Sequence, residues 1–214
     1  MVSNKELGIA MQAYYGGRAE DRIRRTVVPV VLTDFTSQYP TVNALLGNWD
    51  ALTAEDASFQ DWTQEARKML SAVELEDTFS PEFWKQLPFF GLVLPDNDVF
   101  PVRTVYNGRT HNIGLNYLTS KTPIWFAGPE IVAAKLLGRK APLILKAIRL
   151  FPGPRQSGLT DSRLANMVDI NPEHDFFTYV IEQKTLHKPT NKSLSHFLKI
   201  LANSGSYGLF VEVN

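Results

Sequence analysis

Two stretches of the sequence combine charged and polar side chains at spacings that suit chemistry on a phosphate-containing ligand. The first, D-F-T-S-Q-Y-P from Asp34 to Pro40, follows a β-branched, apolar run at 26–33 that predicts a buried strand. A carboxylate at the end of such a strand points into the crevice where ligands gather. Asp34 and the backbone carbonyl of Phe35 could form half of a Mg²⁺ site, because this ion prefers oxygen ligands. By position alone, however, Asp34 is more often a helix cap and Tyr39 a buried aromatic residue.

The second stretch, N-K-S-L-S-H-F-L-K-I-L-A-N-S-G-S-Y-G, predicts a helix over 191–204 with two distinct faces. Its apolar stripe consists of Leu194, Phe197, Leu198 and Leu201. Its polar stripe consists of Lys192, His196, Lys199 and Asn203. Cations repeated along one face can grip phosphate groups, although such a face is more often only solvated.

Both stretches resemble motifs of the family B DNA polymerases. The first is similar to motif A, D-x-x-S-L-Y-P, with Gln38 in place of the usual leucine. The second is similar to motif B, K-x-x-x-N-S-x-Y-G, through Lys199, Asn203, Ser204, Tyr207 and Gly208. An upstream Y-x-G-G element, which in the family lies close to the template strand, is matched by Tyr14, Gly16 and Gly17. The resemblance implies a function: transfer of deoxynucleotides to a primer 3′-hydroxyl by a two-metal mechanism.

The resemblance also implies roles for individual residues. Asp34 and Phe35 would hold Mg²⁺, and Asp34 and Lys199 would be the catalytic residues. The incoming nucleotide would be bound by Phe35, Ser37, Tyr39, Lys192, Lys199, Asn203 and Tyr207. Within that set, Tyr39 would pack under the sugar and exclude a ribose 2′-hydroxyl, and Lys199 would hold the triphosphate. The template and DNA would be contacted by Tyr14, Gly16, Gly17, Ser204 and Gly208.

Two departures from the family pattern matter. Motif B has one residue between serine and tyrosine, whereas this chain has Gly205 and Ser206. The extra residue turns a helix by about 100°, so either a π-bulge realigns Tyr207 or Ser206 takes its place. The second departure is that no Asp-Thr-Asp of motif C, which supplies the other metal carboxylate, occurs anywhere in the sequence. We therefore expect the chain to be part of a longer polymerase and to be inactive alone.

The expected partners are primer–template DNA, deoxynucleoside triphosphates and the remainder of the polymerase chain. No apolar run approaches the roughly 20 residues that span a bilayer, so no membrane contact is expected. The absence of cysteine excludes disulfides and thiolate metal sites, and a cytoplasmic location is expected. The net charge is zero, but residues 1–100 hold 8 Lys and Arg against 15 Asp and Glu, and residues 101–214 hold 14 against 7.

Local patterns predict an α+β fold, and the resemblance specifies a partial palm, an antiparallel sheet with packed helices, plus helical fingers. Helices are expected at 4–15, 40–49, 59–73, 81–87, 130–137, 176–186 and 191–204, with capping chemistry at 53–56. Further strands are expected at 89–94, 99–106, 112–118, 143–151 and from Leu209, with a hairpin turn at Asn107-Gly108. The expected segments are a template-side linker at 1–24, the palm with an insertion at 25–170, the fingers at 171–208 and a returning palm strand at 209–214.

Two other functions remain open from the sequence. Asp96-Asn97-Asp98 follows an apolar strand and could hold a metal and a nucleotide-sugar, as in many glycosyltransferases, although the same residues suit a turn. Alternatively, the basic second half could make the chain a non-catalytic nucleic-acid-binding module. A basic group is available for this role: Lys135, Arg139, Lys140, Lys146 and Arg149.

Overall fold

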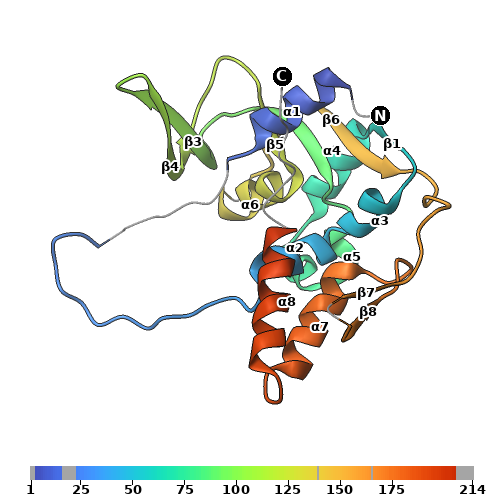
Figure 1. The fold of residues 1–214 in the computed structure, drawn as a ribbon. Helices are drawn as coiled ribbons and strands as arrows, with labels where there is room; N and C mark the ends of the chain where they lie inside the picture. The colour runs from blue at the N-terminus through green and yellow to red at the C-terminus, as the bar shows by residue number, and fades with distance from the viewer. Residues whose placement is uncertain (1–2, 16–22, 139, 165, 206–214) are drawn as a thin grey trace. The chain divides into compact units, whose positions relative to one another are not determined.

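The computed structural model describes residues 3–15, 23–138, 140–164 and 166–205, which belong to two compact units (Figure 1). Unit 1 comprises Met1–Pro29 and Ala57–Phe151, and unit 2 comprises Val30–Asp56 and Pro152–Asn214. Both contain helices and antiparallel strand pairs, so the expected α+β class is confirmed. The unit boundaries differ from the four expected segments, whose palm and fingers labels remain predictions.

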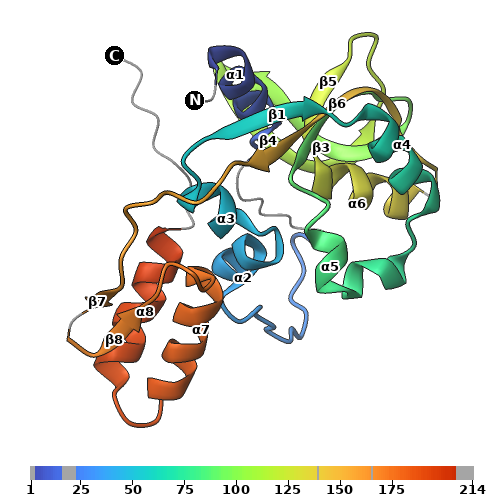
Figure 2. The ribbon, with the colours of Figure 1, turned by 90° about the vertical axis from the view of Figure 1, so that its right-hand side faces the viewer.

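A four-stranded sheet forms the centre of unit 1 (Figure 2). Its strands, in spatial order, are β1 (Ala57–Asp61), β6 (Leu143–Pro152), β2 (Phe89–Leu94) and β5 (Ile124–Ala127). The helices of this unit are α1 (Asn4–Ala13), α4 (Thr63–Ala72), the 3₁₀ helix η1 (Leu75–Phe79), α5 (Pro81–Trp84) and α6 (Gly128–Gly138). Alternate residues of β2 (Phe89, Gly91 and Val93) are buried, as expected for a strand with one face on a core.

Two glycines allow α6 to pack closely against this sheet. A Cβ at Gly91 would lie 2.5 Å from Cδ1 of Ile131, a fully buried residue of α6. A Cβ at Gly128 would collide with the Leu87 carbonyl oxygen and the Phe89 ring. The core beside them contains stacked rings, with Phe100 and Phe126 centroids 3.9 Å apart.

A separate two-stranded hairpin consists of β3 (Asp98–Tyr106) and β4 (Arg109–Leu118). The expected turn is confirmed: Asn107 and Gly108 have φ values of 49° and 71°, which is the backbone of a type I′ turn. A register shift between Pro101 and Arg103 divides the hairpin into a base and an outer part.

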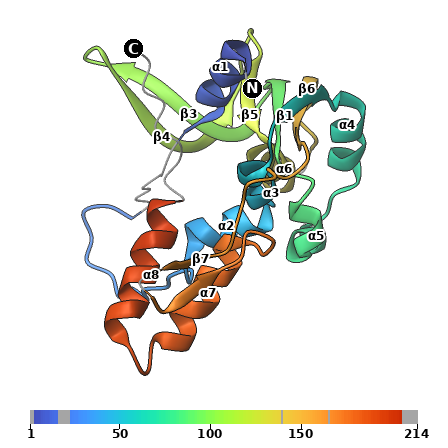
Figure 3. The same cartoon turned by 45° about the vertical axis from the view of Figure 1, so that its right-hand side comes forward.

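Unit 2 is largely helical and is built from two distant parts of the sequence (Figure 3). Its elements are α2 (Gln38–Leu45), α3 (Asn48–Thr53), the short strands β7 (Ser162–Leu164) and β8 (Val168–Ile170), α7 (Phe176–His187) and α8 (Lys192–Ser204). Helices α7 and α8 lie side by side and α2 packs against both. The buried core consists of Val168, Ile170, Val180, Leu194, Leu198 and Ala202.

Several contacts fasten residues 30–56 to residues 152–214. The Trp49 ring stacks on Phe176 with centroids 5.4 Å apart, and its Nε1 donates to the Pro172 carbonyl at 2.9 Å. Ala54 forms a β-bridge with Arg155. Because the aromatic contact buries large apolar surfaces, it contributes much of the attraction between the two parts.

The predicted buried strand at 26–33 is wrong. The segment forms no strand, and Val27 and Leu32 are 101% and 95% exposed. A strand requires a hydrogen-bonding neighbour, and none of the described residues provides one here. Asp34 therefore lies on an exposed loop rather than at the end of a core strand.

Other boundaries were also predicted incorrectly. The expected helix at 59–73 begins only at Thr63, because Phe59 belongs to β1 and the Asp61 carboxylate accepts a hydrogen bond from the Thr63 N–H. The expected helix at 40–49 is broken at Gly47, whose φ is 69°. The segment 53–56, expected to cap a following helix, instead contains the last residue of α3 and its C-cap, Ala54. The strand expected from Leu209 lies outside the described residues.

Candidate functional site

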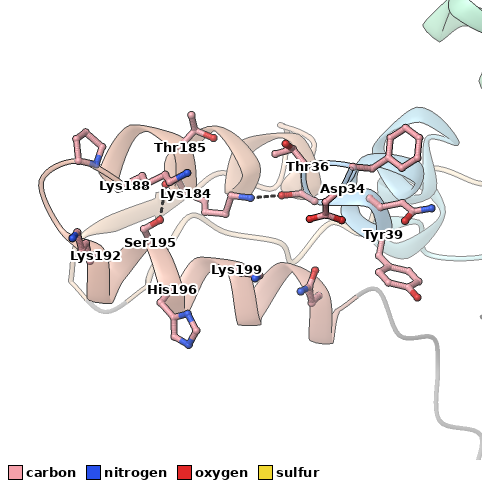
Figure 4. A pocket seen from close by; sticks show the side chains of 15 residues that line it. Asp34, Thr36, Tyr39, Lys184, Thr185, Lys188, Lys192, Ser195, His196 and Lys199 are labelled. Atoms are coloured by element: carbon pink, nitrogen blue, oxygen red, sulfur yellow. Dashed lines mark hydrogen bonds between the residues drawn. The ribbon is translucent and has the colours of Figure 1, made fainter. Parts of the chain in front are cut away.

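An open pocket of about 890 Å³ in unit 2 brings the two sequence motifs together (Figure 4). One side is the loop 34–37 with the first turn of α2, and the other is formed by α7, α8 and the turn between them. The pocket is lined by these predicted site residues: Asp34, Phe35, Ser37, Tyr39, Lys192, Lys199 and Asn203. The structure shows that these residues line one pocket, whereas their individual roles remain predictions.

Positive charge dominates this pocket. Unit 2 contains four lysines, Lys184, Lys188, Lys192 and Lys199, and all of them line the pocket. His196 joins them, and Asp34 is the one carboxylate among the described lining residues. By contrast, Arg155 and Arg163 of the same unit form ion pairs with nearby carboxylates. A concentration of cations facing a single carboxylate suits a ligand with several negative charges.

Lys184 connects the two sides of the pocket and was missed by the motif comparison. Its ammonium group donates a hydrogen bond to the Ser37 hydroxyl. Burial, followed by repulsion from Lys199 and Lys188, lowers the pKa of Lys184, while Asp34 opposes this shift. The four-residue spacing of Lys184 and Lys188 could have revealed it, because residues four apart share a helix face.

Local hydrogen bonds hold the two lysine-bearing helices in place. The Asp175 carboxylate caps α7 by accepting from the Thr178 N–H at 2.6 Å, and the Asn191 side chain caps α8 at 3.0 Å from the Leu194 N–H. The Ser195 hydroxyl donates to the Lys184 carbonyl oxygen at 2.9 Å and so ties α8 to α7.

The buried face of α8 differs in part from the predicted stripe. Leu194 and Leu198 are buried as expected, but Phe197 is 42% exposed. Ala202, one turn after Leu198, is buried on the core face. Lys192, Lys199 and Asn203 nevertheless line the pocket together, because the polar stripe is set by the helix repeat itself.

The loop 34–37 offers part of the ligand set of a magnesium site. Asp34 and the Phe35 backbone carbonyl supply hard oxygens, which suit Mg²⁺. No group of three or more His, Asp or Glu residues with metal-binding geometry occurs in the described part of the chain. Among the described residues that line the pocket, Asp34 is therefore the one carboxylate that could hold a metal.

Of the remaining predicted site residues, the two that the structure describes, Tyr14 and Ser204, do not line this pocket. Tyr14 lies in unit 1, 68% exposed, directly after α1. Ser204 ends α8 and its hydroxyl donates to the Leu201 carbonyl oxygen at 3.0 Å. Four other predicted residues lie outside the described residues: Gly16, Gly17, Tyr207 and Gly208.

The helical hydrogen bonds of α8 remain regular up to Gly205. Its N–H donates to the Leu201 carbonyl oxygen at 3.1 Å, the i to i−4 pattern of an α-helix. No π-bulge therefore occurs before Gly205. Whether Tyr207 or Ser206 occupies the motif B tyrosine position involves residues beyond the described part of the chain.

The two carboxylates of the alternative site close a turn. Asp98 is buried, and one of its oxygens accepts from the Asp96 N–H at 2.9 Å. The Lys140 ammonium lies 3.5 Å from Asp96 and 3.6 Å from Asp98. Because a lysine already neutralises both carboxylates, this geometry favours the turn over a metal and nucleotide-sugar site.

Most of the predicted basic group also has internal partners. Lys135 bonds to Glu74, and Arg149 lies over the Trp62 ring at 4.9 Å and donates to the Lys85 carbonyl oxygen. Arg139 lies outside the described residues. The described cations at 135, 140 and 149 thus stabilise unit 1 rather than form an open basic surface.

In the described part of the chain, no helix has the length and apolar character needed to cross a bilayer. Comparisons with protein-family models, curated proteins and solved structures each found no match to this chain.

Proposed function

We propose that unit 2 binds the triphosphate of a deoxynucleoside triphosphate as part of a template-directed DNA polymerase. The observation that supports this proposal is the single pocket shared by the Asp34 loop and the four lysines of unit 2. A nucleoside triphosphate carries about four negative charges, and ammonium groups bind phosphate oxygens through charge-assisted hydrogen bonds. The charge of the pocket therefore complements this class of ligand.

The pocket also has surface for the nucleoside. Tyr39 is 51% exposed and Phe35 is 77% exposed, and both line the pocket beside the lysines. Aromatic side chains offer flat apolar surfaces against which a sugar or a base can pack. Tyr39 is proposed to contact the sugar and to disfavour a ribose, whose 2′-hydroxyl adds bulk there.

Three charged side chains of the pocket have a proposed part in the reaction. Lys199 and Lys192 would orient the phosphates, and Lys199 would stabilise the charge that develops when the phosphoryl group is transferred. Asp34 and the Phe35 carbonyl would hold Mg²⁺, which supplies further charge neutralisation when bound. The second metal carboxylate would come from another part of the polymerase, so the chain alone is expected not to extend a primer.

Nucleotide binding in the presence of Mg²⁺ tests the proposal. Calorimetric titration with dATP would compare the parent chain with Lys199→Ala, Asp34→Asn and the control Lys68→Ala, which removes an exposed lysine of α4. Loss of a charged hydrogen bond costs about 1.5–3 kcal/mol, so Lys199→Ala should weaken binding about 10- to 100-fold. Asp34→Asn should remove the Mg²⁺ dependence, and Lys68→Ala should bind as the parent does.

Two further ligands show how much of the nucleotide is recognised. Inorganic tripolyphosphate should bind more weakly than dATP, because it lacks the part that Tyr39 and Phe35 are proposed to contact. ATP should also bind more weakly than dATP, and Tyr39→Ala should reduce that difference. If folded Lys199→Ala and Asp34→Asn bind dATP as the parent does, the pocket is not a nucleotide site and the proposal fails.

A further inference from the structure

The β3–β4 hairpin forms an arm that extends from the sheet of unit 1 (Figures 1 and 3). Its strands pair with each other and not with the four-stranded sheet. The outer part, from Arg103 to Asn112, is paired in register around the tight Asn107-Gly108 turn. A two-stranded ribbon with so short a turn presents a narrow tip with two accessible faces.

Contacts at the base and at the first residue pair of the outer part fix the direction of this arm. Phe100 is fully buried and stacks on Phe126. The Arg103 guanidinium lies 4.0 Å from the centre of the Tyr15 ring and donates to the Gln12 carbonyl oxygen at 3.3 Å. Asn112, directly opposite Arg103, donates to the Tyr15 carbonyl oxygen. The arm is therefore anchored before it leaves the core.

The outer part of the arm displays aromatic and cationic side chains. Tyr106 is paired with Arg109, and Thr104 with His111, so these side chains share one face of the ribbon. Tyr106 is 68% exposed, and its ring meets the His111 ring edge-on at 6.5 Å. The Arg109 side chain is exposed, and it forms no hydrogen bond or ion pair with another of the described residues.

The charge of the arm contrasts with that of the sequence before it. Residues 99–129 contain no Asp or Glu, whereas residues 55–98 contain ten, against three Lys and Arg. Three cations lie in the arm and in the loop after it, and their segment of the sequence contains no carboxylate side chain: Arg103, Arg109 and Lys121. Such a surface is complementary to a polyanion that also offers flat rings for contact.

We propose that the β3–β4 arm binds double-stranded DNA, with Arg109 against a phosphate and the Tyr106–His111 face along the groove. The major groove is about 12 Å wide and admits a two-stranded β-ribbon. Phosphate contacts from arginine position such an element without reading sequence. This DNA-binding surface lies in unit 1 and does not depend on the nucleotide pocket proposed for unit 2.

Salt-dependent DNA binding by the whole chain tests this surface. Fluorescence anisotropy with a labelled 20-base-pair duplex, between 50 and 200 mM salt, would compare the parent with Arg109→Ala, Arg109→Lys and Tyr106→Ala. The matched control is again Lys68→Ala, which removes an exposed cation of unit 1 away from the arm. Thermal unfolding should be nearly the same for Arg109→Ala and the parent, because the Arg109 side chain is exposed at the tip of the arm.

The outcomes separate the possibilities. Loss of one phosphate contact should reduce the slope of log affinity against log salt by about one in Arg109→Ala, and Arg109→Lys should restore it. Tyr106→Ala should weaken binding with little change of slope. The proposal is overturned if Arg109→Ala keeps the parent affinity and slope, or if the isolated single strand binds as tightly as the duplex. Titration of the parent and Arg109→Ala with dATP tests the nucleotide site separately. If both bind dATP, a failure of the DNA experiment concerns the arm alone.

Discussion

Lys184 shows at the scale of one residue how the pocket is prepared for an anion. Burial disfavours the charge of its ammonium group, and Lys199 and Lys188 repel that charge further, so the pKa of Lys184 is lowered. In the unfolded chain the group would titrate near 10.5. Below the pKa of Lys184 in the folded protein, this shift therefore lowers the free energy of unfolding. The loss of stability disappears as pH rises from that folded-state pKa towards 10.5. A bound polyphosphate would offset the same repulsion.

The titration of Lys184 can be measured directly. NMR of the chain labelled at lysine Cε, with Lys184→Arg used for assignment, should show Lys184 titrating below 10.5. Lys199→Ala should raise the pKa of Lys184, because Lys199 is the strongest of the charges that repel the Lys184 ammonium group. Tripolyphosphate should raise it as well. A midpoint at or above 10.5 in the free parent protein would contradict this account.

The contrast between Asp34 and Lys184 shows what sequence could predict about the site. The spacings of Asp34, Lys199 and Asn203 match known motifs and predict a shared site, and all three residues line the pocket. Lys184 belongs to no such motif, and its importance comes from the Ser37 contact between segments distant in sequence. A spacing rule describes one helix face, whereas a contact between distant segments requires the tertiary fold.

At the scale of elements, local patterns were reliable where a few residues determine the backbone. The turn at Asn107-Gly108 follows from two residues that tolerate positive φ, and the structure confirms it. The run at 26–33 has strong β propensity, yet it forms no strand because strand formation depends on a partner. The sequence around Phe59 predicts a helix, but this residue belongs to β1. The strand forms because it pairs with β6, which is distant in sequence.

The packing of α6 leads to a prediction about Gly128. Gly128→Ala should lower the free energy of unfolding by about 1–3 kcal/mol, since the new methyl group would overlap a backbone oxygen and a buried ring. Gly138→Ala, at the other end of α6, is the control, because nothing lies within 4 Å of its added Cβ. Urea denaturation measures both. Equal stability of Gly128→Ala and the parent would show that β2 and α6 are not packed this closely.

At the scale of the whole molecule, unit 2 is interrupted in sequence by most of unit 1. The two points of interruption are adjacent in space, because the Gly153 N–H donates to the Asp56 carbonyl oxygen at 2.9 Å. Nearby, the Glu55 N–H donates to the Pro154 carbonyl oxygen at 2.8 Å. The sequence did not indicate this arrangement, since nothing local marks 56 and 152 as neighbours.

A shortened chain tests the independence of unit 2. Replacing residues 57–151 with a Gly-Ser linker of about three residues should leave residues 30–56 and 152–205 able to fold, because short linkers close adjacent ends. Circular dichroism should show helix with cooperative thermal unfolding. The same chain with Trp49→Ala should unfold at lower temperature, since Trp49 joins the two parts. A non-cooperative spectrum for the parent version would show that unit 2 needs the inserted residues.

The exposed run at 26–33 has a consequence for how copies of the protein behave in concentrated solution. β-branched, uncharged residues in an extended segment are the composition from which cross-β aggregates grow. Pro29 divides this run and cannot donate a backbone hydrogen bond, while Arg25 and Asp34 place charges at its ends. Residues of this kind act as gatekeepers against intermolecular strand pairing. Pro29 therefore helps to keep the protein dispersed while the segment remains uncovered.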